Sequence, residues 1–425
     1  MIKLTSTGKD FSQLKWDKVN SSVKEIAKKI DNRTGEGADF LGWTNYASKL
    51  DPKLIKDIET TAKEIRSNFD SLVVIGIGGS YLGAKAVIDA INGLYPNDNF
   101  EIFFLGQTMS TNYTKQVLNK LKNRNFAINV ISKSGTTLEP SLAFRLCKNL
   151  LLEKHDKEYL KKAIYATTDS SKGLLRKEAD TNGYKTFVIP DDVGGRFSVI
   201  TPVGLLPIAC ANISIKDFIK GVIEGEKEYS VTDLEKNPAY KYGALRYLLY
   251  SQKHYASEMY ITYEPQYKSI IEWLKQLFDE SEGKDNKALL CSSAVFSTDL
   301  HSLGQFIQEG SPCLFETILW VEESNEKIEI PFVKGDEDQL NFVAKKTLNY
   351  VNTQAYKATL DAHTSSHTPA NVISIKKLDA KALGNLLYFF FRACAFSAYL
   401  LNVNPFNQPG VEVYKKKMFT LLGRK

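Results

Sequence analysis

The sequence contains few cysteines and histidines, and their placement argues against several kinds of site. Among its 425 residues are five of each. The cysteines are odd in number, widely spaced and mostly set in apolar surroundings, so we expect reduced core residues of a cytosolic protein rather than a disulfide framework. Their spacing matches no metal site. They are Cys147, Cys210, Cys291, Cys313 and Cys394.

A secretion or membrane segment is also lacking. The first residues, MIKLTSTGKDF, contain no apolar core of the kind that a secretory signal has, so we expect a cytoplasmic protein. The most apolar stretch, LLYFFFRACAFSAYLL, is too short to span a bilayer and carries Arg392 in its middle. We therefore predict a buried helix there and no association with a membrane.

Charge of one sign is not in large excess. There are 55 Lys and Arg residues against 49 Asp and Glu, and the formal net charge of +6 is spread along the chain. This balance suits a small anionic substrate and only weakly supports a nucleic-acid partner, which we do not expect. A hydrophobic share of 43% and a charged share of 24% are ordinary for a globular protein of two domains.

The apolar pattern divides the chain into a helical segment and two similar halves. Residues up to about 65 show helical spacing, with Asp51 and Pro52 as a helix start. From Ser71, short apolar runs alternate with helices: SLVVIGI, FEIFFLG, FAINVIS, AIYATT and KTFVIP. A second series follows from about Asp217: SEMYITY, KALLCSSAVF, ETILWVEE and ANVISIKKL, closed by a helix over 380–402.

Strands that alternate with helices indicate parallel sheets covered on both faces, because a parallel crossover needs a helix-length connection. We predict an α/β protein with two doubly wound parallel-sheet domains. A helical segment occupies residues 1–65, the first domain 66–215, and the second domain, with the C-terminal helices, 216–425. Ligands of such sheets bind beyond the carboxyl ends of the strands.

Two loops at such strand ends indicate a phosphate site. GIGGS (76–80) joins a buried strand to a helix, where glycines let an anion approach the backbone N–H groups. It has neither the ending of a nucleotide P-loop nor the dinucleotide glycine spacing, and a tight turn without a ligand is the alternative. SKSGTT (132–137) adds hydroxyls and a lysine, which together can hold a phosphate without a metal. Helix capping would explain one of these hydroxyls but not four.

These two loops together resemble the sugar-isomerase (SIS) type of phosphosugar-binding domain. DDVGGRFS (191–198), followed by TPVGLLPIA, and NPFNQPGVEVYKKK (404–417) resemble the two signatures of the glucose-6-phosphate isomerase (phosphoglucose isomerase) family, in its bacterial short form. QLFDESEGK (276–284) and STDLHSLGQFIQEG (297–310) are similar to that family's base-bearing and histidine-bearing segments. The resemblance extends in the family's order from about Ser71 to Lys417.

The resemblance implies an isomerase of glycolysis and gluconeogenesis that interconverts glucose 6-phosphate and fructose 6-phosphate. The reaction would proceed through ring opening and an enediol or enediolate, without a cofactor or metal. A non-catalytic phosphosugar-binding regulator is one alternative. Such a regulator could dispense with Glu280, Arg196 and Lys415, so the joint presence of these three residues argues against it. An aminotransferring phosphosugar enzyme is another, and it would be expected to carry a glutaminase domain, for which there is no room before Ser71.

Glu280 is the candidate base that moves a proton between C1 and C2, because a partly desolvated carboxylate is a better base than one in water. The alternative is a surface acid in the acidic run DESEGK, which the matching Gln276 and Lys284 argue against. The neighbouring Asp279 stands where many relatives have glycine, and its charge could alter the base. Arg196 would place a permanent charge against the enediolate, with a structural salt bridge as its alternative.

His301 and Lys415 would open the sugar ring, and histidine suits proton transfer near neutral pH. Lys415 heads a triple lysine that could instead be a solvated face. The resemblance further implies a homodimer in which His301 serves the site of the partner chain. His363 and His367 could mimic a metal pair at helical spacing, but Pro369 and the Ser and Thr content favour a loop, and both stay unassigned.

The remaining residues that we expect to bind substrate, mainly through its phosphate, are Gly79, Ser80, Ser132, Lys133, Ser134, Thr137, Gly195, Gln276 and Gln408.

Overall fold

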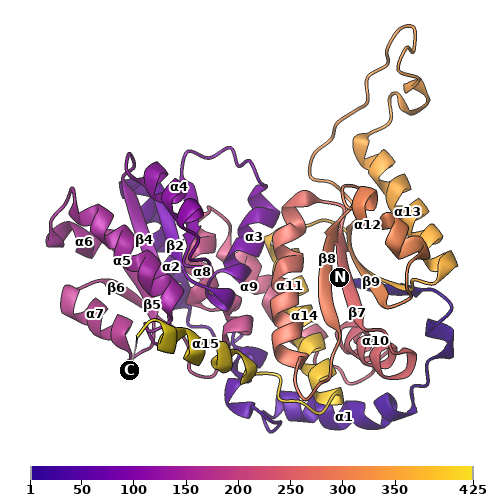
Figure 1. Cartoon of the computed structure of the whole chain (residues 1–425), viewed down its shortest axis with the longest axis horizontal. Helices are drawn as coiled ribbons and strands as arrows, with labels where there is room; N and C mark the ends of the chain where they lie inside the picture. The colour runs from indigo at the N-terminus through magenta and orange to yellow at the C-terminus, as the bar shows by residue number, and fades with distance from the viewer. Residues whose placement is uncertain (1, 424–425) are drawn as a thin grey trace.

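The computed structural model describes residues 2–423 and contains two separate five-stranded sheets, each covered by helices (Figure 1). The first sheet has the order β3-β2-β4-β5-β6, and all of its strand pairs are parallel. Its strands are β2 (Ser71–Ile75), β3 (Glu101–Leu105), β4 (Phe126–Ile131), β5 (Ile164–Thr168) and β6 (Lys185–Val188). The predicted α/β class and the five predicted strands of this half are confirmed.

Helices connect these strands, as a parallel sheet requires. The predicted start of α2 is confirmed: Pro52 is its first residue, and the Asp51 side chain accepts a hydrogen bond from the backbone N–H of Lys53. Ser110 caps α4 and Asp156 caps α6 in a similar way. The helices of this half are α2 (Pro52–Asn68), α3 (Leu82–Asn92), α4 (Thr111–Leu121), α5 (Leu138–Leu152), α6 (Lys157–Ala163), α7 (Leu174–Asn182) and α8 (Pro202–Cys210).

The second sheet has the order β1-β10-β9-β7-β8 and contains one strand that the sequence did not predict. β1 (Lys3–Thr7) pairs antiparallel with β10, so the expectation of a wholly helical segment over residues 1–65 is wrong at its beginning. None of its side chains is fully buried, so no apolar pattern reveals it, and it covers the edge of β10. The four parallel strands are the predicted ones: β7 (Ser257–Thr262), β8 (Leu290–Val295), β9 (Leu314–Val321) and β10 (Ala370–Ile375).

The core of the second half is built around α14 (Ala380–Leu400), which is the predicted buried helix. It is the one helix among residues 2–423 that is long and apolar enough to cross a membrane, and its most apolar window is wholly buried. Arg392 is tolerated there because it donates to Asp31 at 2.6 Å and to the carbonyl oxygen of Tyr229 at 3.1 Å. The helices packed around it are α1 (Asp17–Asp31), α9 (Ile215–Glu228), α10 (Pro238–Lys253) and α11 (Lys268–Glu282).

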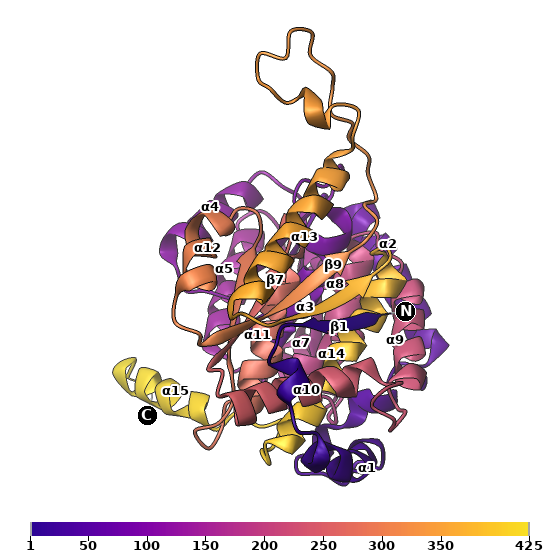
Figure 2. The same ribbon diagram turned by 90° about the vertical axis from the view of Figure 1, so that its right-hand side faces the viewer.

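Between β9 and the next helix the chain forms a long projecting segment, residues 322–347, which we call the arm (Figures 1 and 2). The arm exposes large apolar side chains, including Ile328, Phe332 and Phe342, the last with 78% of its surface accessible. It lies next to α13 (Leu348–Ser366), and α12 (Leu300–Glu309) packs on α13.

The expected loop around the histidine pair is wrong for His363, which lies in α13, whereas His367 is the residue that ends the helix. His363 is buried, and its Nδ1 lies 2.9 Å from Oε1 of Glu316 on β9. This pairing attaches α13 to the sheet and favours helix up to Ser366 despite the local Ser and Thr content. All five cysteines are free, and all but Cys313 are buried.

The chain ends by returning to the first half. α15 (Gly410–Leu421) follows α14 in the chain and lies below α5, as the gold helix in Figure 1 shows. Each half therefore contains a piece of chain from the far end of the sequence: β1 in the second sheet and α15 against the first half. The division at residues 215 and 216 stays a prediction.

Candidate active site

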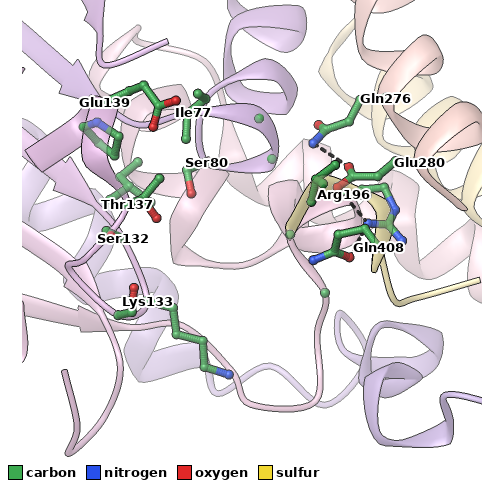
Figure 3. Close-up of a pocket in the computed structure, with 18 of the residues that line it drawn as sticks. Ile77, Ser80, Ser132, Lys133, Thr137, Glu139, Arg196, Gln276, Glu280 and Gln408 are labelled. Atoms are coloured by element: carbon green, nitrogen blue, oxygen red, sulfur yellow. Dashed lines mark hydrogen bonds and ion pairs between the residues drawn. The ribbon is translucent and has the colours of Figure 1, made fainter. Parts of the chain in front are cut away.

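A cavity of about 660 Å³ opens between the carboxyl edge of the first sheet and the segments that contain α11 and α15 (Figure 3). Of the residues that the sequence predicted, all except His301 line it. They come from five separate stretches of chain, and Figure 3 shows the hydroxyl loop with Lys133 on one side and Arg196 with Glu280 on the other. The lining residues that were predicted are Gly79, Ser80, Ser132, Lys133, Ser134, Thr137, Gly195, Arg196, Gln276, Glu280, Gln408 and Lys415.

The first loop follows β2 and is shaped by close backbone contacts. Gly78 has a φ of 56°, in the left-handed region that glycine adopts without strain. A Cβ on Gly79 would lie 2.0 Å from the carbonyl oxygen of Gly195. Glycine at 79 is therefore required for the contact between two cavity-lining loops, in addition to any approach of a ligand. The tight-turn alternative accounts for part of the motif, because the turn itself needs these glycines.

The second loop follows β4 and uses some of its hydroxyls to hold its own shape. The Ser132 hydroxyl accepts a hydrogen bond from the Gly135 N–H at 3.0 Å, and that of Ser134 accepts from the Thr136 N–H at 3.1 Å. Thr137 is the residue before α5, yet its side chain makes no capping hydrogen bond. Its hydroxyl is thus not consumed by the helix end, and it faces the same cavity.

Lys133, in the same loop, is paired with Asp191 of the DDVGGRFS segment. The Lys133 Nζ lies 2.8 Å from Oδ1 of Asp191, whose side chain is largely exposed, while that of Lys133 is 41% exposed. Such an exposed pair contributes little and is readily exchanged for another anion. The lysine can therefore turn toward a ligand phosphate at small cost.

Glu280 lies in the last turn of α11, with its carboxylate at the cavity wall. Gln276, one turn earlier on the same face, donates from Nε2 to Oε2 of Glu280 at 3.0 Å. Arg196 Nη1 lies 3.4 Å from the other oxygen, Oε1. The carboxylate is a quarter exposed and is held on both oxygens, which is not the geometry of a free surface acid.

Arg196 is only 4% exposed, and its N–H groups are largely bound by protein. Nε donates to the Ser281 hydroxyl at 2.9 Å, and Nη1 donates to Oε1 of Gln408 at 3.0 Å. Nη2 donates to the carbonyl oxygen of Pro405 at 2.9 Å. Burial lowers the pKa of Arg196, while the charge of Glu280 acts in the opposite direction. Arg196 therefore links two cavity walls, which is the structural role considered as the alternative for this residue. It also places its charge at the cavity.

Asp279, whose charge could have altered the base, has its carboxylate bound elsewhere. Its Oδ1 accepts a hydrogen bond from the backbone N–H of Cys291 on β8 at 2.9 Å. Burial raises the pKa of Asp279 above its ordinary value, and the hydrogen bond partly offsets this effect. The aspartate therefore attaches α11 to the second sheet.

Lys415 is the member of the triple lysine that lines the cavity, whereas Lys416 and Lys417 do not. It lies on α15, none of whose described residues is buried. Its Nζ donates to Oε1 of Glu412 at 2.8 Å, and this hydrogen bond raises the pKa of Lys415. The lysine is therefore a cation at neutral pH.

His301 is not brought to the cavity by the fold of a single chain. It lies at the beginning of α12, in the second half, and its side chain is exposed. Figure 1 shows α12 beside α13 and away from α15. Within one chain it therefore does not meet Glu280 or Lys415.

Sequence reasoning missed several residues that line the cavity. Asp169 and Lys172 directly follow β5, at the same sheet edge as the two predicted loops, and that position could have revealed them. Glu139 lies in the first turn of α5, just after the hydroxyl loop. Phe40 comes from the N-terminal segment, where no local pattern indicates a site.

Comparisons with known proteins agree on one family. The model of the phosphoglucose isomerase family matches residues 53–422. A glucose-6-phosphate isomerase from Staphylococcus haemolyticus is 50% identical over 416 residues, which are 97% of this chain and 94% of that protein. One from Bacillus anthracis is 49% identical over 413 residues, covering 96% and 92% of the two chains.

Solved structures share the fold. The crystal structure of a hypothetical protein from Thermus thermophilus superposes with a TM-score of 0.89 at 26% identity, over 99% of this chain and all of that one. A glucose-6-phosphate isomerase from Chlamydia trachomatis superposes with a TM-score of 0.81 at 19% identity, covering 96% of this chain and 85% of its own.

Proposed function

Because the chain belongs to the phosphoglucose isomerase family, it interconverts glucose 6-phosphate and fructose 6-phosphate in glycolysis and gluconeogenesis, and from this premise we propose how its residues divide the reaction. The reaction moves a proton between C1 and C2 of an open-chain sugar that exists mostly as a ring. The site must therefore bind the phosphate, open the ring, move the carbon-bound proton and stabilise the enediolate.

The substrate phosphate binds to the two glycine and hydroxyl loops. These loops offer several short donors and a lysine that an exposed aspartate holds only weakly. Thr137 supplies a hydroxyl that no helix cap consumes, and it directly precedes the N-terminus of α5, which favours an anion. Ser80, Ser132, Lys133 and Ser134 complete this part of the site, with the backbone of Gly79.

Glu280 moves the proton between C1 and C2. Its carboxylate is oriented by Gln276 and lies against the charge of Arg196. When Glu280 has taken the proton, negative charge passes to the substrate oxygens, and a fixed guanidinium next to them stabilises that charge. Because the N–H groups of Arg196 are largely bound, it acts mainly through its charge.

Ring opening uses Lys415 together with His301. One proton goes to the ring oxygen while another leaves the C1 hydroxyl, so the step needs a donor and an acceptor on the same sugar. Lys415 lines the cavity as a cation. Gln408, which accepts a hydrogen bond from Arg196, adds an amide for a sugar hydroxyl.

The observation that carries these roles is the meeting of the hydroxyl loop with Arg196, Glu280 and Gln408 in one cavity (Figure 3). A coupled assay that measures glucose 6-phosphate formed from fructose 6-phosphate tests them residue by residue. We expect substitutions of cavity residues to reduce turnover. Conservative changes on the same helices outside the cavity should not.

The remaining catalytic residue, His301, acts in the site of a second copy of the chain. Two observations support this homodimer. His301 is exposed and distant from its own cavity, and the arm exposes apolar side chains on a segment with little protein around it. A closed two-fold dimer would make both sites equivalent, so that each chain gives one histidine and receives one.

Mixed dimers test the exchange of His301. Glu280→Gln chains and His301→Ala chains, each inactive alone, are combined under conditions that allow subunits to exchange. In each hybrid one site has both defects and the other has none, so activity should return to about a quarter of the wild-type value for random pairing. The two variants incubated separately are the control. Hybrids that form and stay inactive would contradict the assignment of His301 to the partner's site.

The cytoplasm is the proposed location, and two domains that meet near residue 215 are the proposed organisation. Reduced cysteines support a cytoplasmic location, since disulfides are rare in the cytoplasm. The two-domain organisation is supported by the two separate sheets. The short connection between α8 and α9 lies between the chain segments that form them. Cell fractionation and limited proteolysis around residues 211–214 test these two points.

A further inference from the structure

A lysine beyond the end of α11 holds the turn that carries Glu280. The last carbonyl groups of an α-helix have no partner within the helix. Lys284 Nζ donates to the carbonyl oxygen of Glu280 at 2.9 Å and to that of Ser281 at 2.6 Å. One side chain therefore satisfies two of the carbonyl groups at the end of the base-bearing helix.

The usual closure of a helix end is missing here. Gly283, the cap residue of α11, has a φ of −70° and a ψ of 70°, so it does not form the left-handed turn that normally satisfies these carbonyls. Its N–H donates to the carbonyl oxygen of Asp279, one position before Glu280. The carbonyls of Glu280 and Ser281 consequently depend on Lys284.

The region behind Glu280 is open, which makes this contact more important. A second cavity of about 830 Å³ adjoins the active-site cavity and shares Glu280, Gln408 and Val411 with it. Lys284 lines this second cavity. On the side of this cavity the turn is held by the two hydrogen bonds from Lys284, whereas on its other side Ser281 and Glu282 are buried.

Electrostatics around Lys284 act in both directions. An ammonium group at a helix C-terminus is favourable, and the carboxylates of Glu280 and Glu282 add to this. Burial, followed by the charge of Arg196, lowers the pKa of Lys284 to about 8. The titratable or charged groups around it are Arg196 on the segment before α8, Asp279, Glu280 and Glu282 on α11, Cys394 on α14, and Glu36, Asp285 and Lys287 at the second cavity.

We propose that Lys284 is a positioning residue for the isomerisation: its ammonium group holds the last turn of α11, so that the Glu280 carboxylate stays between Gln276 and Arg196. The proposal rests on the role of Glu280 as the base. Loss of the proton from Lys284 removes the charge from both of its hydrogen bonds. Turnover therefore requires the protonated lysine and declines as the pH rises past about 8.

Three variants test the contact. Lys284→Met removes the ammonium group and keeps the length of the side chain, Lys284→Arg keeps the charge, and Lys287→Met is the matched control. Lys287 lies in the same loop, but its Nζ donates to the carbonyl oxygen of Leu401 at 3.1 Å. We expect kcat to fall at least about tenfold in Lys284→Met with KM within about twofold, because small misplacements of a catalytic group reduce turnover strongly. Lys284→Arg should restore most of the loss, and Lys287→Met should resemble the wild type.

The pH profile separates positioning from a merely structural role. In the wild type kcat should fall with a midpoint near pH 8, and in Lys284→Arg this fall should move at least about one pH unit higher, since guanidinium keeps its proton. The same alkaline fall in both proteins would overturn the proposal, and this comparison decides even if Lys284→Met does not fold. Wild-type kcat in Lys284→Met would also overturn it.

Glu280→Gln distinguishes a failure of the positioning role of Lys284 from a failure of Glu280 as the base. If it is inactive while Lys284→Met has wild-type kcat, only the positioning role fails. If Glu280→Gln is itself active, the role of the base fails, and the proposal for Lys284 fails with it.

Discussion

The substitution Glu280→Gln tests the assigned base with little disturbance of its surroundings. It replaces one carboxylate oxygen by an amide nitrogen of the same size. Arg196 can still donate to the remaining oxygen. In the wild type, Gln276 donates from Nε2 to Glu280, and the Oε1 of Gln276 is buried without a hydrogen-bond partner. Its amide can therefore turn over and accept from the new nitrogen, so the packing is kept while the base is lost.

The expected loss is large in turnover and small elsewhere. General base catalysis typically supplies about a hundred- to ten-thousand-fold, so kcat should fall by at least about a hundredfold. The side chain is a quarter exposed and its contact with Arg196 is 3.4 Å long. Because Arg196 is buried, losing its anionic partner lowers folding stability, and the hydrogen bonds from Arg196 to Ser281, Gln408 and Pro405 limit that loss. The Michaelis constant should stay within about threefold, because the phosphate loops are unchanged.

The assay has two parts. The coupled assay measures kcat and KM for fructose 6-phosphate, and incubation of the wild type in heavy water should place deuterium at C2 of the glucose 6-phosphate formed. Glu272→Gln is the matched control: it is the same change on the same helix, at a carboxylate that accepts from Ser293 at 2.9 Å and does not line the cavity. Substantial turnover in Glu280→Gln, comparable to that of the control, would remove Glu280 from the mechanism.

Three further predictions concern the phosphate loops and the residue beside the base. Replacing Ser132 and Thr137 together by alanine should raise the KM for fructose 6-phosphate at least about tenfold, since each hydrogen bond to a charged group contributes about 1.5–3 kcal/mol; an unchanged KM would locate the phosphate elsewhere. Asp191→Asn should release Lys133 and lower that KM by up to about fivefold, the value of one exposed ion pair, with the effect disappearing at high salt. Asp279→Asn keeps an acceptor for the N–H of β8 and should leave kcat near wild type. Burial raises the pKa of this aspartate above 3.8 in the folded chain, whereas the unfolded chain keeps the ordinary value. The folded state therefore loses stability relative to the unfolded state as the pH rises above 3.8. The variant's gain in Tm over the wild type should therefore be larger at pH 7 than at pH 4, and a gain independent of pH would contradict this account.

Local pattern was sufficient for most of the fold. β2 and β4 are continuous apolar runs bounded by glycine and polar loops, and a buried parallel strand has that signature whatever surrounds it. α14 is apolar on every face because it lies inside the second half, so its composition alone indicated burial. β1 escaped prediction because its side chains stay largely exposed and only its backbone, through pairing with β10, makes it a strand.

His363 shows where local reasoning fails. The Ser and Thr residues around it and the proline that follows favour a loop, but burial against Glu316 stabilises a helix up to Ser366. The partner that decides the conformation lies 47 residues away in the sequence. Tertiary contacts of this kind override local preference and leave no mark at the position itself.

The sequence by itself determined the parts of the site that neighbouring residues build. The order of glycines and hydroxyls defines the two loops, and the four-residue spacing of Gln276 and Glu280 places both on one helix face. Only the tertiary structure decided that Arg196 would join Glu280 to Gln408, and that His301 would stay outside the cavity of its own chain. The physical reason is range: helix period and turn chemistry act over a few residues, whereas contacts between distant segments follow from how helices and sheets pack.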